Sequence, residues 1–513
     1  MQSVPADGEL TRKFELEVWS KIPHVEGGRV LNPTPLVDVT AALLDCAKSE
    51  YGMNIDVDGA RVFAKLDSKI HGGSVKVRPA AMILRDAIAR GNLRRGQAIF
   101  EATSGNFGIA LGSLGRLGVD VVALVSRRLQ EGVVKQLKAD GVKLIDLDID
   151  ICPAPGFKGD ADLLVAKGVA SGVRQQLGEL GFDPRKFDGV RPDAERLLAG
   201  QDAIGLAKLL ARAYGGFCPE QYENELNVEA HWEVTGPEID QQLDAFGTSL
   251  KDADFVCAFG TGGTAGGIGR YLASKHGRKG VRVVFPLKGQ DVAGIRTKEK
   301  AEGLVFYEPK RYLGDHEADF DEATRVFEYF NRRGHDVGES GALALYACMQ
   351  LLNYGVGKEF VVMVADGASK YASEVKAVAR KGKRDQVRLE EAASSIGDYS
   401  GVVWAHNMFV PKAEGVRLIA SALGCEESSI RVAEVGDVQA VLNGMEPSGQ
   451  FQKLLPKDGR PLLVVCMAGN TSLMLARVLE RMGVSAESLI GGITGLPDSR
   501  GKQPFELVQI ARR

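Results

Sequence analysis

The first residue in this chain whose type and surroundings could do chemistry is Lys76. It follows Gly72 and Gly73 and precedes an apolar run, residues 79–90, that has the pattern of a helix. A lysine amine held in such a loop can attack a carbonyl carbon and form a Schiff base. One lysine in one loop does not indicate a site, so its meaning depends on the stretches that follow it.

Three further short stretches follow Lys76 along the chain. Residues 103–106 form a small polar loop, and Ser340 lies in a tight turn between two glycines. Residues 260–264 form a glycine-rich turn that opens a helix, where backbone N–H groups and two threonine hydroxyls could bind a phosphate. This turn lacks both the dinucleotide-binding spacing and the Lys-Ser/Thr ending of a nucleotide P-loop. Together with the lysine, these stretches are the parts needed to hold pyridoxal phosphate.

The elements that must position these stretches alternate between strand and helix. Short apolar runs typical of buried strands alternate with segments of helical spacing, which indicates βαβ units around a parallel sheet. The expected strands lie at residues 61–66, 97–101, 119–125, 142–147, 255–259, 281–286 and 360–365. The sequence therefore predicts an α/β fold in which the lysine loop follows the first of these strands.

Two segments interrupt this alternation. Residues 158–200 carry helical charge patterns and proline breaks, and we expect them to be a surface insertion. A basic run that begins at Lys376 predicts a linker, which places a domain boundary near residues 385–398. We therefore expect a catalytic domain at residues 1–385 and a small α/β domain at residues 396–513.

Length and composition limit the class of protein. A chain of 513 residues is too long for one core, and 44% hydrophobic with 26% charged residues is typical of a globular protein. The net charge of −3 gives no basic surface for nucleic acid, and no apolar run is long enough to span a bilayer. Seven scattered cysteines without a Cys-x-x-Cys pair argue against a disulfide framework or a zinc site. We expect a cytoplasmic protein with no metal, nucleic-acid or membrane partner.

In their order along the chain, the four stretches and the residues around them resemble the cysteine synthase branch of the fold-type II pyridoxal-phosphate enzymes. The resemblance runs from about residue 31 to residue 371 and rests on residues 65–67, 72–76, 101–106, 221–224, 231, 235–239, 260–264 and 338–341. It implies two parallel-sheet α/β subdomains, a bound pyridoxal 5′-phosphate and a homodimer. Tyr222 and His231 fall within it, and we expect them in the core or an interface rather than in catalysis.

The resemblance also implies a role for each stretch. Lys76 would bind the cofactor covalently and act as the acid/base, and Asn106 would hydrogen-bond the O3′ atom of the cofactor. The substrate carboxylate would lie on Thr103, Ser104 and Gly105. The cofactor phosphate would be bound by Gly260, Thr261, Gly262, Gly263 and Thr264. Ser340 would hydrogen-bond the pyridine nitrogen.

A serine at the pyridine nitrogen has a chemical consequence. Unlike an aspartate, a neutral hydroxyl does not stabilise a protonated ring, so the cofactor is a weaker electron sink and favours α,β-elimination over transamination. The expected reaction is β-replacement or β-elimination on cysteine or an O-activated serine, through an aminoacrylate. The alternative is a desulfhydrase or a serine/threonine dehydratase, which releases an oxo acid and ammonia. The expected partners are a small amino-acid substrate and a sulfur donor or acceptor.

The C-terminal domain contains one candidate nucleophile, Cys466. It ends an apolar strand at residues 461–466 and precedes a loop and a helix, and the helix N-terminus would lower the thiol pKa. This stretch and residues 489–493 resemble the persulfide-carrying loop of the rhodanese family, although Thr471 stands where that family has an arginine. The resemblance implies that Cys466 carries sulfur to or from the active site. The alternative is an inert buried cysteine in a regulatory or dimerisation domain.

Overall fold

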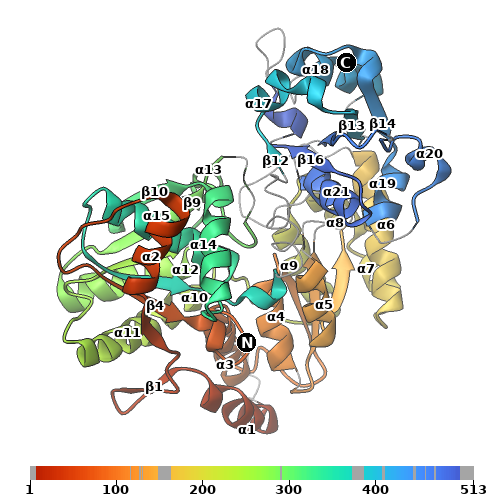
Figure 1. Ribbon diagram of the computed structural model, residues 1–513. Coiled ribbons are helices and arrows are strands. Elements are labelled where there is room, and N and C mark those ends of the chain that lie inside the picture. Colours follow the sequence, from red (N-terminus) through yellow and green to blue (C-terminus); the bar gives the residue numbers. More distant parts are fainter. Residues whose placement is uncertain are drawn as a thin grey trace. The chain divides into compact units, whose positions relative to one another are not determined.

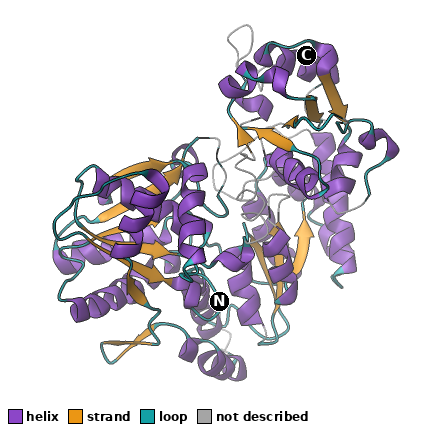
Figure 2. Ribbon diagram, in the orientation of Figure 1, coloured by secondary structure: helices purple, strands orange, loops and turns teal. Residues whose placement is uncertain are grey.

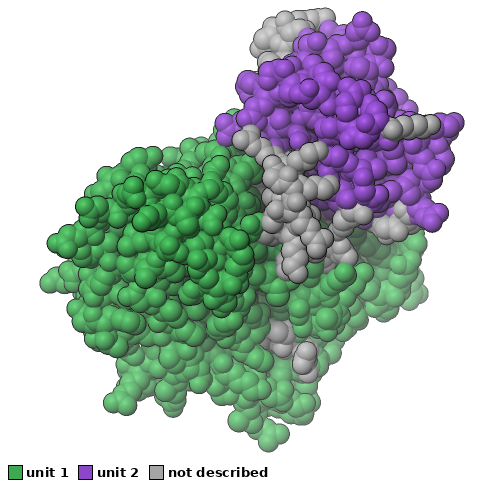
Figure 3. All heavy atoms as spheres, viewed as in Figure 1, with its two compact units in different colours: residues 1–372 green, residues 373–513 purple. Residues whose placement is uncertain are grey.

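The computed structural model divides the chain into two compact units, Met1–Ala372 and Ser373–Arg513 (Figure 3). The structure describes residues 7–115, 117–125, 129, 131–147, 163–288, 290, 292–371, 386–406, 411–442, 446–456, 458–466, 470–490 and 492–496. The sequence placed the boundary near residues 385–398. Strand β12 (Gln386–Val387) already pairs within the sheet of the second unit, so that unit begins before residue 396.

The first unit is built on two sheets, and each is surrounded by helices (Figures 1 and 2). The larger has the strand order β10-β9-β8-β11-β4-β3, and the smaller has the order β5-β6-β7. The edge pair β3–β4 is antiparallel, and the other pairs in these sheets are parallel. The strands are β3 (Leu36–Asp38), β4 (Arg61–Leu66), β5 (Ala98–Ala102), β6 (Asp120–Val125), β7 (Lys143–Asp146), β8 (Asp254–Ala258), β9 (Val281–Pro286), β10 (Gly314–Ala318) and β11 (Glu359–Val364). The predicted α/β alternation around parallel sheets is confirmed.

The central strands are buried along nearly their whole length because helices cover both faces of the larger sheet. All residues of β4 after Arg61 and all residues of β11 after Glu359 are buried. The two strands pair in parallel with Val62 opposite Phe360 and Leu66 opposite Val364. Continuous burial of this kind is typical of parallel sheets. In a sheet with one face exposed to solvent, buried and exposed residues would alternate along each strand.

The helices of the first unit follow the strands closely. They are α1 (Gly8–Glu17), α2 (Thr40–Tyr51), α3 (Val77–Ala89), α4 (Asn106–Gly115), α5 (Glu131–Ala139), α6 (Leu163–Glu179), α7 (Pro184–Asp188), α8 (Arg191–Ala199), α9 (Ala203–Tyr214), α10 (Leu226–Ala230), α11 (Gly236–Leu243), α12 (Gly263–Tyr271), α13 (Lys298–Ala301), α14 (Phe320–Arg332) and α15 (Glu339–Asn353). A short antiparallel ribbon of β1 (His24–Glu26) and β2 (Arg29–Leu31) lies near the N-terminus. Four of these helices, α3, α4, α12 and α15, begin at or next to stretches that the sequence marked for chemistry.

The segment predicted to be a surface insertion contributes to the core instead. Its described part forms helices α6, α7 and α8, and residues 158–162 lie outside the described residues. Val173, Leu177 and Phe187 are fully buried and belong to the same apolar cluster as Phe100 of β5. The charged residues that suggested a surface excursion form the outer faces of these helices, while the apolar faces cover the smaller sheet.

The second unit contains a five-stranded sheet in which every recorded pair is parallel. Its order is β12-β16-β15-β13-β14. The remaining elements are β13 (Gly401–Ala405), β14 (Ile430–Ala433), β15 (Leu462–Val465), β16 (Ala486–Leu489), α17 (Leu389–Ser394), α18 (Lys412–Leu423), α19 (Val435–Leu442), α20 (Gly449–Gln452) and α21 (Asn470–Arg481). Across the described residues of both units, no helix combines the length and hydropathy that crossing a membrane requires.

A buried network of charges joins three elements of the first unit. Arg78, in the first turn of α3, pairs with Asp67 at 2.7 Å and with Glu238 of α11 at 2.6 Å. Lys65, at the end of β4, pairs with the same Glu238 at 2.6 Å. Burial lowers the pKa of Lys65 to about 8, while Asp67 and Glu238 raise that of Arg78 above its usual value. Because each of these side chains is at most 1% exposed, every charge needs its partner.

Removing one charge from this network should therefore destabilise the first unit. We expect Glu238→Gln to lower its free energy of unfolding by about 3–5 kcal/mol, because Lys65 and Arg78 would lose their shared carboxylate. Urea titration followed by tryptophan fluorescence measures this change. The matched control is Glu233→Gln, an exposed glutamate five residues earlier, which should change the free energy by less than about 0.5 kcal/mol. Equal effects of the two substitutions would show that the network does not hold these elements together.

Candidate active site

Lys76 lies at the end of a loop that two glycines shape. Gly72 and Gly73 have φ angles of 95° and 73°, in the left-handed region that favours glycine. The backbone N–H of Val75 donates to the carbonyl of Ala365 at 2.7 Å, which ties the loop to the end of β11. Helix α3 begins immediately after the lysine, so the base of its side chain is fixed from both directions.

The Lys76 side chain opens into a cavity at the carboxyl ends of β8 and β11 and beside the loops that follow β4 and β5. The cavity is lined by Val75, Lys76, Ser104, Asn106, Phe107, Val133, Gln221, Tyr222, Cys257, Ala258, Phe259, Gly260, Thr261, Gly262, Thr264, Ala265, Ala293, Gly294, Ile295, Ser340, Met363, Ala365 and Tyr371. Carboxyl ends of parallel strands are where α/β proteins bind ligands. The four stretches that the sequence selected therefore meet around one cavity.

The environment of the lysine makes its amine reactive. Burial lowers the pKa of Lys76 to about 8, and the positive charge of Arg296 adds to this effect. Arg296 is itself buried and donates from Nη2 to the hydroxyl of Tyr222 at 2.7 Å. A lowered pKa leaves more of the amine uncharged near neutral pH, which is the form that attacks a carbonyl carbon.

The glycine-rich turn approaches the lysine so closely that side chains are excluded from it. A Cβ atom added to Gly260 would lie 2.8 Å from the Gly294 carbonyl oxygen and 3.8 Å from the Lys76 amine. At Gly262, which has a φ of 94°, it would lie 2.7 Å from the carbonyl oxygen of Phe306. Gly263 begins helix α12 behind the cavity wall. Glycines here leave the backbone N–H groups at the start of a helix open to a phosphate.

The two threonines of this turn are held by a buried polar layer. Asn227 donates from Nδ2 to the Thr261 hydroxyl at 3.0 Å, and the Thr264 hydroxyl lies 3.2 Å from Nε2 of His231. His231 also contacts the Thr235 hydroxyl at 3.0 Å. Burial lowers the pKa of His231 to about 3, so the ring is neutral at neutral pH. His231 is a buried support for the turn, which agrees with the expectation that it is a core residue.

The asparagine loop is shaped by Thr103. Its hydroxyl accepts hydrogen bonds from the backbone N–H groups of Gly105 and Gly108, each at 3.1 Å, and so caps helix α4. Thr103 and Gly105 lie behind the cavity surface, whereas Ser104 lines it. Asn106 also lines the cavity, and its side-chain amide donates to Asp366 at 2.7 Å. Of the three residues predicted to bind a carboxylate, Ser104 alone lines the cavity with its side chain.

Ser340 lies in the first turn of α15. Its helix follows directly after Gly338, whose N–H donates to the carbonyl of Asp366 at 2.9 Å. The serine is 8% exposed and lines the cavity. The structure therefore places Ser340 in the same cavity as Lys76 and the glycine-rich turn.

Several lining residues had no assigned role in the sequence. Gln221 and Tyr222 contribute one wall, and Gly294 and Ile295 contribute another. Tyr222 is buried, as expected for a core residue, but it also faces the cavity and accepts the hydrogen bond from Arg296. For residue 294, the sequence offered a single indication of a ligand site: a glycine that follows a buried strand. A glycine in that place is equally common in an ordinary turn, so it does not identify a ligand site.

Cys466 of the second unit lies where the sequence placed it, at the end of β15 and before α21. Its thiol is 2% exposed and accepts a hydrogen bond from the Ser472 hydroxyl at 3.3 Å. Ser472 also lies 2.8 Å from the hydroxyl of Ser488. Residues 467–469, which connect the cysteine to the helix, lie outside the described residues.

The family to which the first unit belongs follows from a comparison of the whole sequence with protein families. The pattern of the pyridoxal-phosphate dependent enzymes matches residues 33–367, which is well over half of the chain. The chain belongs to the pyridoxal-phosphate dependent enzyme family. The match covers both sheets of the first unit and all four stretches around the cavity.

Several known proteins resemble the chain over about two thirds of its length. A cysteine synthase of Aquifex aeolicus is 30% identical over 67% of this chain and 89% of its own length. An O-acetylserine dependent cystathionine beta-synthase of Bacillus subtilis is 27% identical over 63% of this chain and 91% of its own. A solved hydrogen sulfide-producing enzyme of Fusobacterium nucleatum is 21% identical with a TM-score of 0.47, over 66% of this chain and 96% of its own.

The cavity suits the cofactor of a pyridoxal-phosphate dependent enzyme. It offers a reactive amine at Lys76, and Gly260 and Gly262 leave a turn of backbone that a Cβ atom would obstruct. A phosphate dianion fits the N-terminus of α12, where N–H groups lack partners within the helix. Both requirements, an amine for the aldehyde and N–H groups for the phosphate, are met in one cavity.

The glycine at residue 262 gives a direct test of this fit. We expect Gly262→Ala to weaken binding of pyridoxal phosphate by about tenfold or more, because the new Cβ atom would push the turn away from Phe306. Equilibrium dialysis of the unloaded protein measures the affinity. The control is Gly277→Ala, because Gly277 also has a left-handed φ, of 65°, but no atom lies within 4 Å of the new Cβ. The control therefore has the same kind of backbone strain but no steric clash. Equal losses in the two variants would contradict a phosphate site on this turn.

Proposed function

We propose that the first unit catalyses β-replacement or β-elimination on cysteine or an O-activated serine. The observation that carries this proposal is the approach of Lys76 to the glycine-rich turn, where a Cβ at Gly260 would lie 3.8 Å from the amine. An aldehyde joined to this amine would carry its phosphate within reach of that turn. The names of the relatives, cysteine synthase and cystathionine beta-synthase, support the same class of reaction.

Each part of the cavity has a distinct task in this proposal. Lys76 holds the cofactor and, once released from it, moves a proton at the α-carbon of the substrate. Ser104 and the N–H groups at the start of α4 bind the substrate carboxylate, which a helix N-terminus favours. Residues 260–264 bind the phosphate, Asn106 hydrogen-bonds the O3′ atom, and Ser340 hydrogen-bonds the pyridine nitrogen.

The choice of elimination over other reactions rests on Ser340. When bound, pyridoxal phosphate accepts electrons from the α-carbon of an amino acid and weakens the bonds around it. The neutral Ser340 hydroxyl leaves the ring nitrogen unprotonated, so a leaving group on Cβ takes those electrons most readily. We further propose, from the resemblance alone, that the protein is a homodimer and, from its scattered cysteines, that it is cytoplasmic.

A screen of amino acids tests the reaction. With O-acetylserine and sulfide, we expect the protein to form cysteine and acetate, because Cβ would lose acetate and then accept the sulfur. Chromatography of the products measures this. Pyruvate and ammonia without cysteine would instead favour the desulfhydrase or dehydratase. Lys76→Ala should lower the rate by about 10²-fold or more and abolish the visible absorbance of the bound cofactor.

The matched control for that variant is Lys48→Ala, which removes an exposed lysine on α2. It should leave both the absorbance and the rate unchanged. If Lys76→Ala retains the absorbance of lysine-bound cofactor, another amine holds it and the assignment of the site is wrong.

We propose in addition that Cys466 carries sulfur for this reaction. The support is its place after a strand of a parallel sheet and before α21, and the hydrogen bond from Ser472, which stabilises a thiolate. In the proposed step the thiolate takes the outer sulfur of thiosulfate and releases sulfite, which leaves a persulfide on Cys466. A small thiol would then reduce the persulfide, which releases the outer sulfur as sulfide for the first unit, restores the Cys466 thiol and leaves the reductant as its disulfide.

Mass spectrometry of the protein after incubation with thiosulfate tests this role. We expect the peptide that contains Cys466 to gain the mass of one sulfur atom, and Cys466→Ser to lose the gain. Cys425→Ser, which removes a partly exposed cysteine of the same unit, should leave it intact. An unmodified Cys466 under both thiosulfate and polysulfide would mean that this cysteine is a buried core residue.

A further inference from the structure

A cluster of four polar side chains lies beside the cavity, and two of them, Asn106 and Tyr371, line it. Asn106 donates from Nδ2 to Oδ2 of Asp366 at 2.7 Å, and the Lys370 ammonium donates to Oδ1 of Asn106. Lys370 also lies 3.2 Å from Oδ2 of Asp366, and the Tyr371 hydroxyl donates to that same oxygen. Each end of the Asn106 amide is therefore bound to a charged group.

The charges of these partners fix which way the amide faces. An ammonium has only donors, so it must meet the Asn106 oxygen, and a carboxylate has only acceptors, so it must meet the Asn106 nitrogen. If the amide were turned over, its nitrogen would face the Lys370 ammonium, donor against donor, and its oxygen would face the Asp366 carboxylate, acceptor against acceptor. Burial and the nearby Asp366 raise the pKa of Tyr371 well above its usual value, so its hydroxyl stays protonated as a donor.

This orientation leaves one N–H of Asn106 for the cavity. The amide nitrogen carries two hydrogens, and Asp366 accepts one of them. Asn106, the first residue of α4, lines the cavity together with Tyr371, whose hydroxyl it also contacts, so the second hydrogen can be shared between that hydroxyl and a ligand oxygen. A ligand oxygen inside the cavity is therefore an acceptor that this geometry allows.

The cluster is held in place by backbone contacts on two sides. Asp366 forms an isolated antiparallel bridge with Ser74, two residues before Lys76. Helix α5 approaches so closely that a Cβ on Gly132 would lie 2.2 Å from the Lys370 carbonyl oxygen. The cluster therefore connects the loop that carries the lysine with the loop that carries Asn106.

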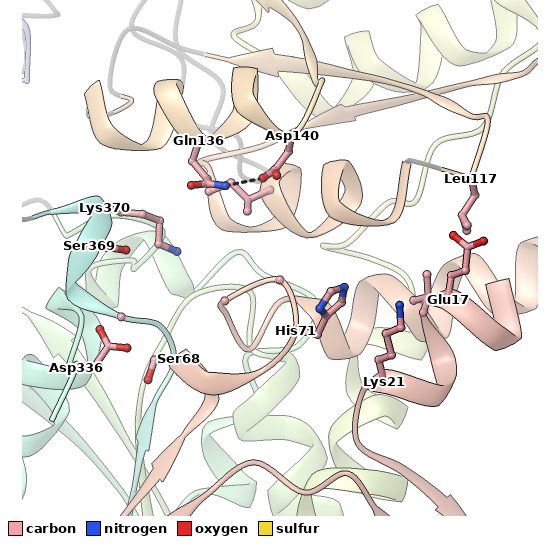
Figure 4. Close-up of a pocket in the computed structure, with 15 residues that line it drawn as sticks. Glu17, Lys21, Ser68, His71, Leu117, Gln136, Asp140, Asp336, Ser369 and Lys370 are labelled. Atoms are coloured by element: carbon pink, nitrogen blue, oxygen red, sulfur yellow. Dashed lines mark hydrogen bonds between the residues drawn. The ribbon is translucent and has the colours of Figure 1, made fainter. Parts of the chain in front are cut away.

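Lys370 is the member of the cluster that water can reach. Figure 4 shows it at the edge of a second cavity, with a volume of about 460 Å³, which is also lined by Ser369, Asp336 and His71. Asp366 is fully buried by contrast. Water can therefore fill the space that a substitution at Lys370 leaves. For this reason a substitution at Lys370 is a better probe of the cluster than one at Asp366.

From these contacts we infer that Lys370 and Asp366 are positioning residues, which aim the Asn106 amide N–H at an oxygen of the bound pyridoxal phosphate. The inference rests on the proposed function, because it assigns the ligand of Asn106. It predicts that Lys370 acts through Asn106 and that the two residues are coupled in binding the cofactor.

A double-mutant cycle on cofactor affinity tests this coupling. In the wild-type background, Lys370→Met should weaken pyridoxal phosphate binding by about tenfold, because the amide loses the donor that fixes its orientation. In the Asn106→Ala background the same substitution should change the affinity by less than about twofold. Equilibrium dialysis of the unloaded full chain gives the affinity, and the absorption maximum of the loaded protein gives a second readout. Lys370→Arg, which keeps a donor, should restore both.

The matched control is Lys358→Met, an exposed lysine just before β11, which should alter neither measurement. An equal loss from Lys370→Met in both backgrounds, or no effect of Asn106→Ala, would overturn the inference. If Lys370→Met does not fold, as judged by its melting temperature, Lys370→Gln takes its place in the cycle. Failure of the proposed function would look different, because the wild-type chain itself would then bind no pyridoxal phosphate.

Discussion

The ion pairs around Arg78 are the constraint on which the site depends. The guanidinium of Arg78 joins the first turn of α3 to Asp67, just after β4, and to Glu238 on α11. Charges buried this deeply require partners at bonding distance, so strand and helices can adopt only one relative position. Lys76 lies two residues before Arg78, and its amine reaches the glycine-rich turn because α3 is anchored in this way.

Much of the first unit could be predicted because its signals are local. Apolar runs as long as a strand, separated by segments of helical spacing, indicated parallel sheets, and the structure shows them. The loop of Lys76 and the turn at residues 260–264 could be found because glycine is required where the backbone turns left-handed or approaches another chain segment closely. The roles of these residues toward a cofactor are still predictions.

The hydrogen bonds within the site and the burial of helices α6 to α8 could not be predicted, because they depend on contacts between residues that are distant in the sequence. Asn106 and Asp366 are separated by 260 residues, and nothing near either residue indicates that they bond. The helices of residues 163–199 looked like a surface excursion because charged residues and prolines interrupt their apolar pattern. Their burial became visible only once Phe187 and Leu177 could be placed against the smaller sheet. The surroundings of Cys466 depend in the same way on Ser488, from the neighbouring strand.

The lowered pKa of Lys76 has a consequence for newly made protein. With a pKa of about 8, about a tenth of this amine is uncharged at pH 7, compared with about one in 2,500 for an ordinary lysine. Lys65 has a similar pKa but is fully buried in an ion pair, whereas Lys76 lines the cavity. Until the cofactor binds, sugars, cyanate and metabolic aldehydes can therefore modify Lys76 faster than an ordinary lysine. Prompt loading with the cofactor protects this side chain from chemical damage as well as preparing it for catalysis.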